Sequence, residues 1–484
     1  MIFEIQATRH EDGDTKTFFY DNMANVLKDA DGKVFQFTDL DTSSLPEMTP
    51  YISFDKNTPL KKSKAINHLK IQLGLSCNYS CDYCSQKFVE RAPETSKKDI
   101  DAFMEKLNNL EFSEERGLHV EFWGGEPFVY WKTLKPLAEA IREKFDSWGI
   151  RPQFSVITNG SILTDEMIDW LVMMDFAVSI SHDGPGQYVR GPDPFDNPEQ
   201  KERILGFYRM MTRLGKSFSF NAMLNAKNQS RKEIYDWFVN LTGDENVILG
   251  EGSIVDAYDE EGEVNSLITK KDHFEFRQRA FGEMYAYNGE IGFRSQLGKI
   301  QDFSNGLLSH RSANFLGQKC GMDIENVLSV DLRGNVMTCQ NVSSLETSKN
   351  GESHHGGTLD DIEGVELKSV THWSKRKECP ECPVLHMCKG ACMFLDNKFW
   401  EISCANSYSD NVALFATAIA LLTDGYIPTL IKSDTLPLDR QDIFGTIYQH
   451  EETPRQKIIP IKVVKEIVAT IDDVQVYGKS HLEL

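Results

Sequence analysis

Between about residue 66 and residue 290, short apolar runs alternate with longer segments in which apolar residues recur every three or four positions. The runs of strand length are Leu69–Leu75, Leu118–Trp123, Gln153–Thr158, Ala177–Ser181, Ser217–Leu224 and Val247–Gly250. The segments of helical period are Ser96–Leu110, Trp131–Ser147, Asp165–Met174, Glu199–Leu214, Arg231–Leu241 and Lys271–Tyr287. Strands that alternate with helices predict a parallel sheet covered by helices. Because the alternation stops near residue 290, we expect an α/β fold, a partial (β/α)6 TIM barrel, with its chemistry where strands end and loops begin.

The pattern changes on both sides of this region. In residues 1–65 we expect short strands, with Thr17–Tyr20 and Val34–Phe37 paired around Asp31-Gly32. Periodicity fades over residues 291–404, and the rest of the chain has a helix candidate and two strand candidates: Val412–Leu422, Tyr426–Ile431 and Ile458–Val463. The predicted units are therefore 1–65, 66–290, 291–404 and 405–484.

Composition narrows the possible partners and compartment. The 52 Lys and Arg against 73 Asp and Glu give a net charge of −21, which argues against a nucleic-acid partner. We find no apolar run of about 18 residues, so the sequence predicts no membrane span. The first residues lack the apolar segment of a secretory signal, so we expect a cytoplasmic protein. In that compartment the ten cysteines are more typical of metal binding than of disulfides.

Three cysteines form the first group, Cys77, Cys81 and Cys84, directly after the first predicted strand. A 4Fe–4S cluster held by cysteine alone needs four thiolates, so three would leave one iron open to a small chelating molecule. A zinc site completed by a distant ligand, or three unrelated buried cysteines, are the alternatives.

The run CNYSCDYC, with Tyr83 before its last cysteine, resembles the signature loop of radical S-adenosylmethionine (SAM) enzymes. This resemblance implies that the open iron binds the amino and carboxylate groups of SAM, and that a 5′-deoxyadenosyl radical takes a hydrogen atom from the substrate. Gly124-Gly125-Glu126-Pro127 resembles the family's GGEP loop. By this resemblance Gly124, Gly125 and Glu126 contact the methionyl ammonium of SAM. A simple turn is the alternative for GGEP taken alone.

The next two strands also end in loops like those of the family. These loops are Thr158-Asn159-Gly160 and Ser181-His182-Asp183-Gly184-Pro185. The resemblance makes Ser181 and Arg190 candidates for the methionyl carboxylate or the ribose of SAM. His182 stands where the family usually has Ile or Leu, and we interpret it as a structural residue.

The other seven cysteines resemble the seven-cysteine SPASM pattern of radical enzymes that act on peptides. They are Cys320, Cys339, Cys379, Cys382, Cys388, Cys392 and Cys404. The resemblance implies two auxiliary 4Fe–4S clusters, and so three clusters in all. Cys320, Cys339 and Cys392 would bind the first auxiliary cluster, which lacks a fourth cysteine, and Cys379, Cys382, Cys388 and Cys404 the second. A zinc knuckle is the alternative for CPECPVLHMC alone.

Several reactions fit this pattern. We expect cross-linking of a ribosomally made precursor peptide, with the auxiliary clusters accepting an electron and a flavodoxin or ferredoxin supplying reductant. Oxidation of Cys or Ser to formylglycine is less favoured, because Gln340 follows Cys339 where relatives have an Asp base. Peptide epimerisation needs a spare thiol, and none of the ten cysteines is left over. A non-catalytic iron–sulfur or zinc scaffold is the remaining alternative.

The sequence indicates less clearly how the precursor peptide is recognised than which cofactors are bound. The N-terminal hairpin offers a strand edge to a leader peptide or simply caps a sheet. The acidic segment Asp256–Glu263 is interpreted as a solvated surface loop, with attraction of a basic peptide as the alternative.

Overall fold

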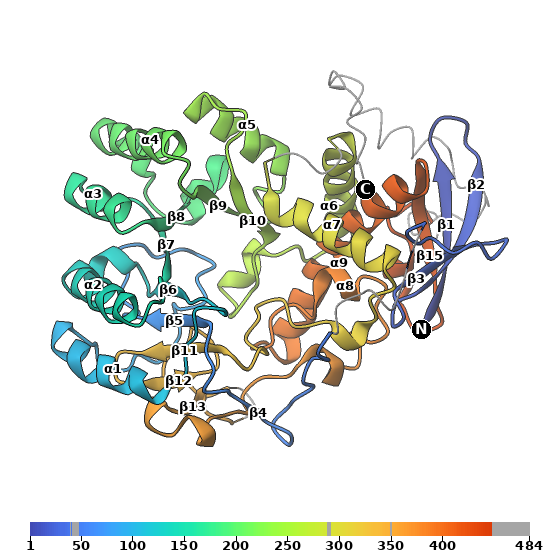
Figure 1. Cartoon of the computed structure of the whole chain (residues 1–484). Coiled ribbons are helices and arrows are strands. Elements are labelled where there is room, and N and C mark those ends of the chain that lie inside the picture. Colours follow the sequence, from blue (N-terminus) through green and yellow to red (C-terminus); the bar gives the residue numbers. More distant parts are fainter. Residues whose placement is uncertain (39, 41–47, 288–291, 349–350, 448–484) are drawn as a thin grey trace.

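The computed structural model describes residues 1–38, 40, 48–287, 292–348 and 351–447. Its largest sheet has nine strands in the order β10-β9-β8-β7-β6-β5-β11-β12-β13 (Figure 1). The six barrel strands are β5 (His68–Gln72), β6 (His119–Trp123), β7 (Gln153–Thr158), β8 (Phe176–Ser181), β9 (Phe218–Leu224) and β10 (Leu249–Ile254). They pair in parallel with their chain neighbours, which confirms the predicted partial barrel.

Helices connect the strands. They are α1 (Ile100–Lys106), α2 (Trp131–Ser147), α3 (Asp165–Met173), α4 (Pro198–Arg213), α5 (Arg231–Thr242) and α6 (Lys270–Ala286). Side-chain caps fix several of their starts: Thr164 accepts from the Met167 amide, and Ser230 from the Glu233 amide. Figure 1 shows α1 to α4 along one side of the barrel strands.

The two faces of the barrel strands differ in polarity. In β6, Val120 and Phe122 are fully buried, whereas His119, Glu121 and Trp123 are only half-buried. Successive side chains of a strand point to opposite faces, so the apolar set lies under the helices and the polar set faces the barrel interior. The interior of this barrel therefore contains polar and charged side chains, whereas apolar side chains fill the interior of many closed barrels.

The sheet continues beyond β5 into the cysteine-rich region. β11 (Val327–Asp331) pairs in parallel with β5, and β12 (Asn335–Met337) and β13 (His355–Thr358) follow in antiparallel fashion. The short strands β4 (Leu60–Lys61) and β14 (Glu366–Leu367) form a separate pair. The cysteine-rich region is thus joined edge to edge with the barrel.

The N-terminal strands form a four-stranded sheet with a strand from near the other end of the chain. Its order is β15-β1-β2-β3, with β15 (Tyr426–Lys432), β1 (Ile2–Arg9), β2 (Thr15–Asp21) and β3 (Val26–Asp29). The predicted hairpin is wrong: Thr17–Tyr20 lies in β2 but pairs with β1 and β3, and Val34–Phe37 forms no strand. Both edges of β2 are already paired, so Val34 makes only an isolated bridge to Lys28 of β3.

Three further helices lie between the two sheets (Figure 1): α7 (Arg294–Leu308), α8 (Leu385–Cys388) and α9 (Asn397–Leu422). The short helix α10 (Leu438–Gln441) follows β15. α9 contains the predicted helix 412–422 but begins earlier and carries Cys404, so it spans residue 405, one of the predicted unit limits. The limits themselves stay a prediction, and the strand predicted at Ile458–Val463 lies outside the described residues. Among the described helices none is both long and apolar enough to cross a membrane.

Candidate active site

The loop after β5 brings three free thiols together at the carboxyl edge of the barrel. Cys77, Cys81 and Cys84 line one cavity of about 720 Å³. Burial raises the pKa of Cys81 to about 12, and the Cys84 and Cys77 thiols act in the same direction, against the charge of Arg190. Such crowding disfavours three free thiolates, and a cationic iron–sulfur cluster would relieve it. The thiols present therefore fit a cluster.

The GGEP loop after β6 packs directly on this cysteine loop. The amide of Gly125 donates to the Gly74 carbonyl (3.1 Å) and that of Glu126 to the Ser76 carbonyl (3.0 Å). A Cβ on Gly125 would lie 2.4 Å from the Ser76 oxygen, and one on Gly124 2.8 Å from the Gly74 oxygen. Backbone-to-backbone packing therefore requires the two glycines. This requirement adds to the close approach of a ligand, for which the sequence already indicated glycine.

Glu126 is the buried carboxylate of the site. Its Oε1 accepts from the Thr158 hydroxyl (2.7 Å) and the Phe128 amide (3.1 Å), and its Oε2 accepts from the Asn159 amide (2.7 Å). Burial raises the pKa of Glu126 to about 6, and these hydrogen bonds act against that rise. The side chain is 1% exposed but lines the cavity, so it can meet a bound cation there.

Ser181 and Arg190 also line the cavity, but Arg190 already has a partner. Its guanidinium donates to Asp183 (2.9 Å), a carboxylate that also accepts from the Met223 amide (2.9 Å) and from the Tyr83 hydroxyl. Its Nε is buried without a hydrogen-bond partner. Asp183, which sequence reasoning left without a role, therefore links the segment after β8 to the cysteine loop and to strand β9.

His182 is structural, as expected. It is fully buried, contacts Asp193 (3.0 Å) through Nε2, and stacks on Trp237 at 4.7 Å between ring centroids. Burial lowers the pKa of His182, so the neutral ring is favoured.

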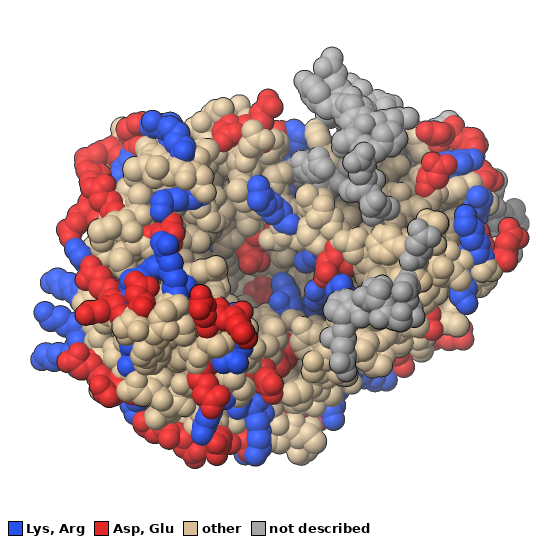
Figure 2. All heavy atoms as spheres, in the orientation of Figure 1, with Lys and Arg blue, Asp and Glu red and all other residues tan. Residues whose placement is uncertain are grey.

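The cysteine-rich region also contributes to the lining of this cavity. Cys320, Cys339 and Cys392 line it. Burial raises the pKa of Cys392 to about 12, with Asp256, Cys339 and Cys320 adding to the rise. Figure 2 shows the hollow in the middle of this face, with acidic and basic side chains inside it.

The other four cysteines surround a second, smaller pocket. Cys379, Cys382 and Cys388 come from the segment that ends in α8, and Cys404 from α9. Burial raises the pKa of Cys379, and the other three thiols raise it further. Arg440 of α10 donates to the Cys404 sulfur from both terminal nitrogens (3.5 and 3.6 Å). The structure thus gathers the ten cysteines as three, three and four.

Sequence reasoning missed several charged residues of the large cavity. They are Lys70, Arg91, Glu121, Glu251 and Lys319. The alternation in HLKIQ and HVEFW carried a signal for Lys70 and Glu121, which share the inward face of β5 and β6. The solvated-loop interpretation of 256–263 is wrong for its first residues, because Asp256 and Tyr258 line the cavity. The Tyr258 hydroxyl lies 3.8 Å from the Cys392 sulfur.

Comparison with known proteins agrees with this geometry. The model of the radical SAM superfamily matches residues 71–238, from β5 to α5. The chain carries a radical SAM domain. The radical SAM cyclopropyl synthase TigE of Paramaledivibacter caminithermalis is 20% identical over 366 residues, which cover 71% of each chain. The cysteine-type anaerobic sulfatase-maturating enzyme of Clostridium perfringens is 21% identical over 342 residues, 65% of this chain and 85% of that one.

A solved structure gives the same fold. Native anSMEcpe with bound AdoMet and Cp18Cys peptide superposes with a TM-score of 0.52 at 18% identity, covering 74% of this chain and 99% of that one. The radical SAM resemblance and the partial barrel are therefore confirmed. The family's cofactors are a 4Fe–4S cluster and SAM.

Proposed function

We propose that this radical SAM enzyme closes an intramolecular carbon–carbon, ether or thioether cross-link in a ribosomally made precursor peptide. The observation that carries the proposal is the shared cavity, which is lined both by Cys77, Cys81 and Cys84 and by Cys320, Cys339 and Cys392. A substrate side chain in this cavity would have access both to the place where a radical forms and to a place that can take up an electron. The volume, about 720 Å³, is typical of cavities that bind small molecules.

In this proposal Cys77, Cys81 and Cys84 hold the SAM-binding 4Fe–4S cluster. When bound, cluster and SAM together supply a 5′-deoxyadenosyl radical that abstracts hydrogen. Glu126 orients the methionyl ammonium through a charge-assisted hydrogen bond, and Gly124 and Gly125 leave room beside it.

Ser181 and Arg190 complete the proposed cofactor site. The Ser181 hydroxyl is available to the carboxylate or ribose of SAM. Arg190 is anchored by Asp183 through Nη2, and its buried Nε has no hydrogen-bond partner. Anchoring fixes the direction of the guanidinium and so lowers the entropic cost of binding an anionic group.

The remaining cysteines bind two auxiliary clusters in this proposal, the second through Cys379, Cys382, Cys388 and Cys404. Cross-linking removes two hydrogens from the peptide: one hydrogen atom goes to the radical, and a proton and an electron leave as the new bond closes. The proposal assigns the electron to the auxiliary clusters, and a flavodoxin or ferredoxin supplies the reductant for the first step.

Formylglycine formation remains the second candidate, because a sulfatase-maturating enzyme is among the relatives. Gln340 counts against it. Its side chain lines the cavity next to Cys339, where an amide cannot accept the proton that a carboxylate base would take. Epimerisation is a further alternative, with no cysteine outside the three groups to return a hydrogen atom.

Mass spectrometry of a co-expressed peptide tests the proposal. A short peptide encoded beside this gene is the substrate to use. We expect it to lose two hydrogens when the enzyme is present, and to be unchanged with Cys81→Ala. Retention of all hydrogens with deuterium incorporated from solvent would instead support epimerisation, and conversion of Cys or Ser to an aldehyde would support formylglycine formation.

A further inference from the structure

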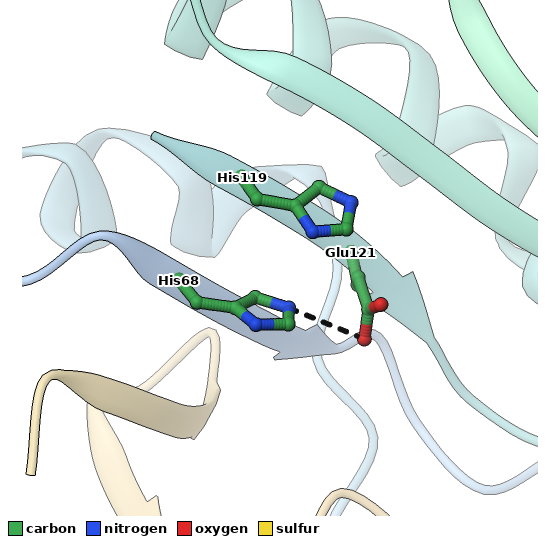
Figure 3. Close-up of side chains that lie close together, drawn as sticks. All are labelled: His68, His119 and Glu121. Carbon is green, nitrogen blue, oxygen red and sulfur yellow. Dashed lines mark ion pairs between the residues drawn. The ribbon is translucent and has the colours of Figure 1, made fainter. Parts of the chain in front are cut away.

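Three ligand-type side chains meet inside the barrel, at its opposite end from the cysteine loop. His68 opens β5 and His119 opens β6, and the parallel register pairs them directly (Figure 3). Glu121 lies two residues further along β6 on the same inward face. One ligand atom from each of the three lies within 4.8 Å of the others.

The two imidazole rings lie face to face. Their rings stack at 4.6 Å between centroids with 24° between planes. Nε2 of His119 contacts the Ser155 hydroxyl (2.8 Å), which leaves Nδ1 of the same ring to bind a metal ion. Nε2 of His68 is buried without a hydrogen-bond partner and lies 3.5 Å from the Glu121 carboxylate. This nitrogen makes no hydrogen bond but faces the carboxylate as an ion pair, so a cation between the two would be bound by both.

The protonation states also suit a metal ion. Burial lowers the pKa of His119, and the neighbouring His68 ring lowers it further, so the neutral, ligand form is favoured. Burial alone would raise the pKa of Glu121, but contacts with His68, Lys70 and Trp123 lower it to about 2. Glu121 is therefore a carboxylate at neutral pH.

Surrounding groups orient the carboxylate, as they do in protein metal sites. The Trp123 indole donates to Oε2 of Glu121 (2.9 Å). Lys70 places its ammonium 3.6 Å from the same oxygen and so competes for it. Because Lys70 and Glu121 both line the large cavity, Lys70 has space to turn away when an ion binds.

We propose that His68, His119 and Glu121 form a metal site, free of thiolates, for a divalent transition-metal ion such as Zn²⁺. Two imidazoles and one carboxylate, with coordination positions left open, are a ligand set of catalytic zinc centres. Of the three residues, Glu121 lines the large cavity. Occupancy of this site would release Lys70 toward the interior of the same cavity.

The test is zinc binding by the full chain with its clusters reconstituted. After anaerobic dialysis against Zn²⁺ and then buffer, we expect about one zinc per chain, with X-ray absorption showing only nitrogen and oxygen neighbours at about 2.0–2.1 Å. The double variant His68→Ala/His119→Ala and Glu121→Gln should each lower zinc affinity at least tenfold. His10→Ala, in the turn after β1, is the matched control and should retain zinc.

Iron content and the visible spectrum of each variant report whether it has folded with its clusters. Failure of the wild-type chain to retain zinc would overturn the proposal, as would sulfur neighbours at about 2.3 Å, which place the metal on cysteines. Equal retention by the well-folded Glu121→Gln and double variants would overturn it too. In those cases the three side chains are an ion-pair cluster with Lys70.

Discussion

At the scale of single residues, Glu126 makes a prediction about pH. Burial raises its pKa to about 6, so the carboxylate that we propose for the SAM ammonium is fully ionised only above that pH. We expect SAM affinity to fall as pH is lowered from 7 to 5, approaching tenfold per unit below pH 6. Calorimetry of SAM binding across this range measures it.

Glu126→Gln is the control for this pH dependence. It should bind SAM more weakly, with affinity that no longer changes between pH 5 and 7, because the amide does not titrate. A wild-type affinity that is flat over the same range would contradict the assignment of the ammonium to Glu126.

Arg440 makes a prediction about reduction potential. Its guanidinium donates twice to the Cys404 sulfur and lines the pocket of the four cysteines. A positive charge and hydrogen bonds at a cluster sulfur stabilise the reduced cluster, which is the more negative state. Arg440→Gln should therefore make the reduction potential of the cluster proposed for this pocket more negative. A redox titration followed by electron paramagnetic resonance measures that potential.

Arg440→Lys keeps the charge and should shift that potential less. The signals of the other two proposed clusters should not move in either variant. An Arg440→Gln protein whose three potentials all match the wild type would show that the contact has no electronic role.

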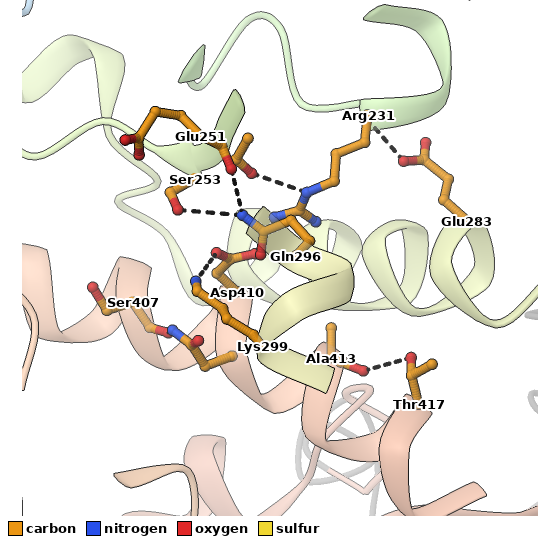
Figure 4. A network of polar contacts seen from close by, with 12 residues as sticks. Arg231, Glu251, Ser253, Glu283, Gln296, Lys299, Ser407, Asp410, Ala413 and Thr417 are labelled. Atoms are coloured by element: carbon orange, nitrogen blue, oxygen red, sulfur yellow. Dashed lines mark hydrogen bonds and ion pairs between the residues drawn. The ribbon is translucent and has the colours of Figure 1, made fainter. Parts of the chain in front are cut away.

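At the scale of elements, a buried ionic network joins the barrel to α9 (Figure 4). Asp410 of α9, 2% exposed, contacts Arg231 at the start of α5 and lies 3.8 Å from the Lys299 ammonium of α7. Arg231 also donates through Nε to the Gly252 carbonyl in β10 (2.9 Å). Since α9 carries Cys404, this network ties the four-cysteine pocket to the barrel.

Removing the carboxylate takes a partner from the buried Arg231 and from the half-buried Lys299. Asp410→Ala should lower the free energy of unfolding by about 3–5 kcal/mol, as measured by chemical denaturation. Glu401→Ala, an exposed position on the same helix, should change it by less than about 0.5 kcal/mol. A loss as small for Asp410→Ala as for Glu401→Ala would show that the network contributes little.

Elements with local signals could be predicted from the sequence, and long-range pairings could not. Each of the six barrel strands overlaps a predicted apolar run, but β10 shares only Leu249 and Gly250 with the predicted Val247–Gly250. Phe3, Ile5 and Ala7 alternate in β1 and carried a signal that was overlooked, but the pairing of β1 with β15 joins opposite ends of the described chain. No local pattern specifies such a partner.

The same distinction applies to the site. Cysteine spacing predicted a group of three and a group of seven, and the SPASM resemblance divided the seven into three and four, because Cys320, Cys339 and Cys392 lie too far apart in the chain for spacing alone to group them. The cluster of His68, His119 and Glu121 inside the barrel was missed, because His68 and His119 are brought together only by the register of β5 and β6. Asp256 and Tyr258 were misplaced, since an acidic composition alone does not show which side chains turn inward.

At the scale of the whole molecule, three parts of the chain converge on the proposed chemistry. The barrel and the cysteine-rich region share one sheet and one cavity. The N-terminal sheet supports the second cysteine pocket: the Asn22 amide donates to the carbonyls of Pro380 and Cys382 (both 2.9 Å). This contact gives the N-terminal strands a structural role, while binding of a leader peptide along their edge stays a prediction.

The central claim is that the shared cavity generates a radical and passes an electron across it. The most direct measurement is 5′-deoxyadenosine formation by the anaerobically reconstituted chain with dithionite, SAM and the precursor peptide. We predict 5′-deoxyadenosine from the wild type, none above background from Cys81→Ala, and 5′-deoxyadenosine without cross-linked peptide from Cys392→Ala. No 5′-deoxyadenosine from a wild-type chain with its clusters reconstituted, or an equal amount from Cys81→Ala, would contradict the claim.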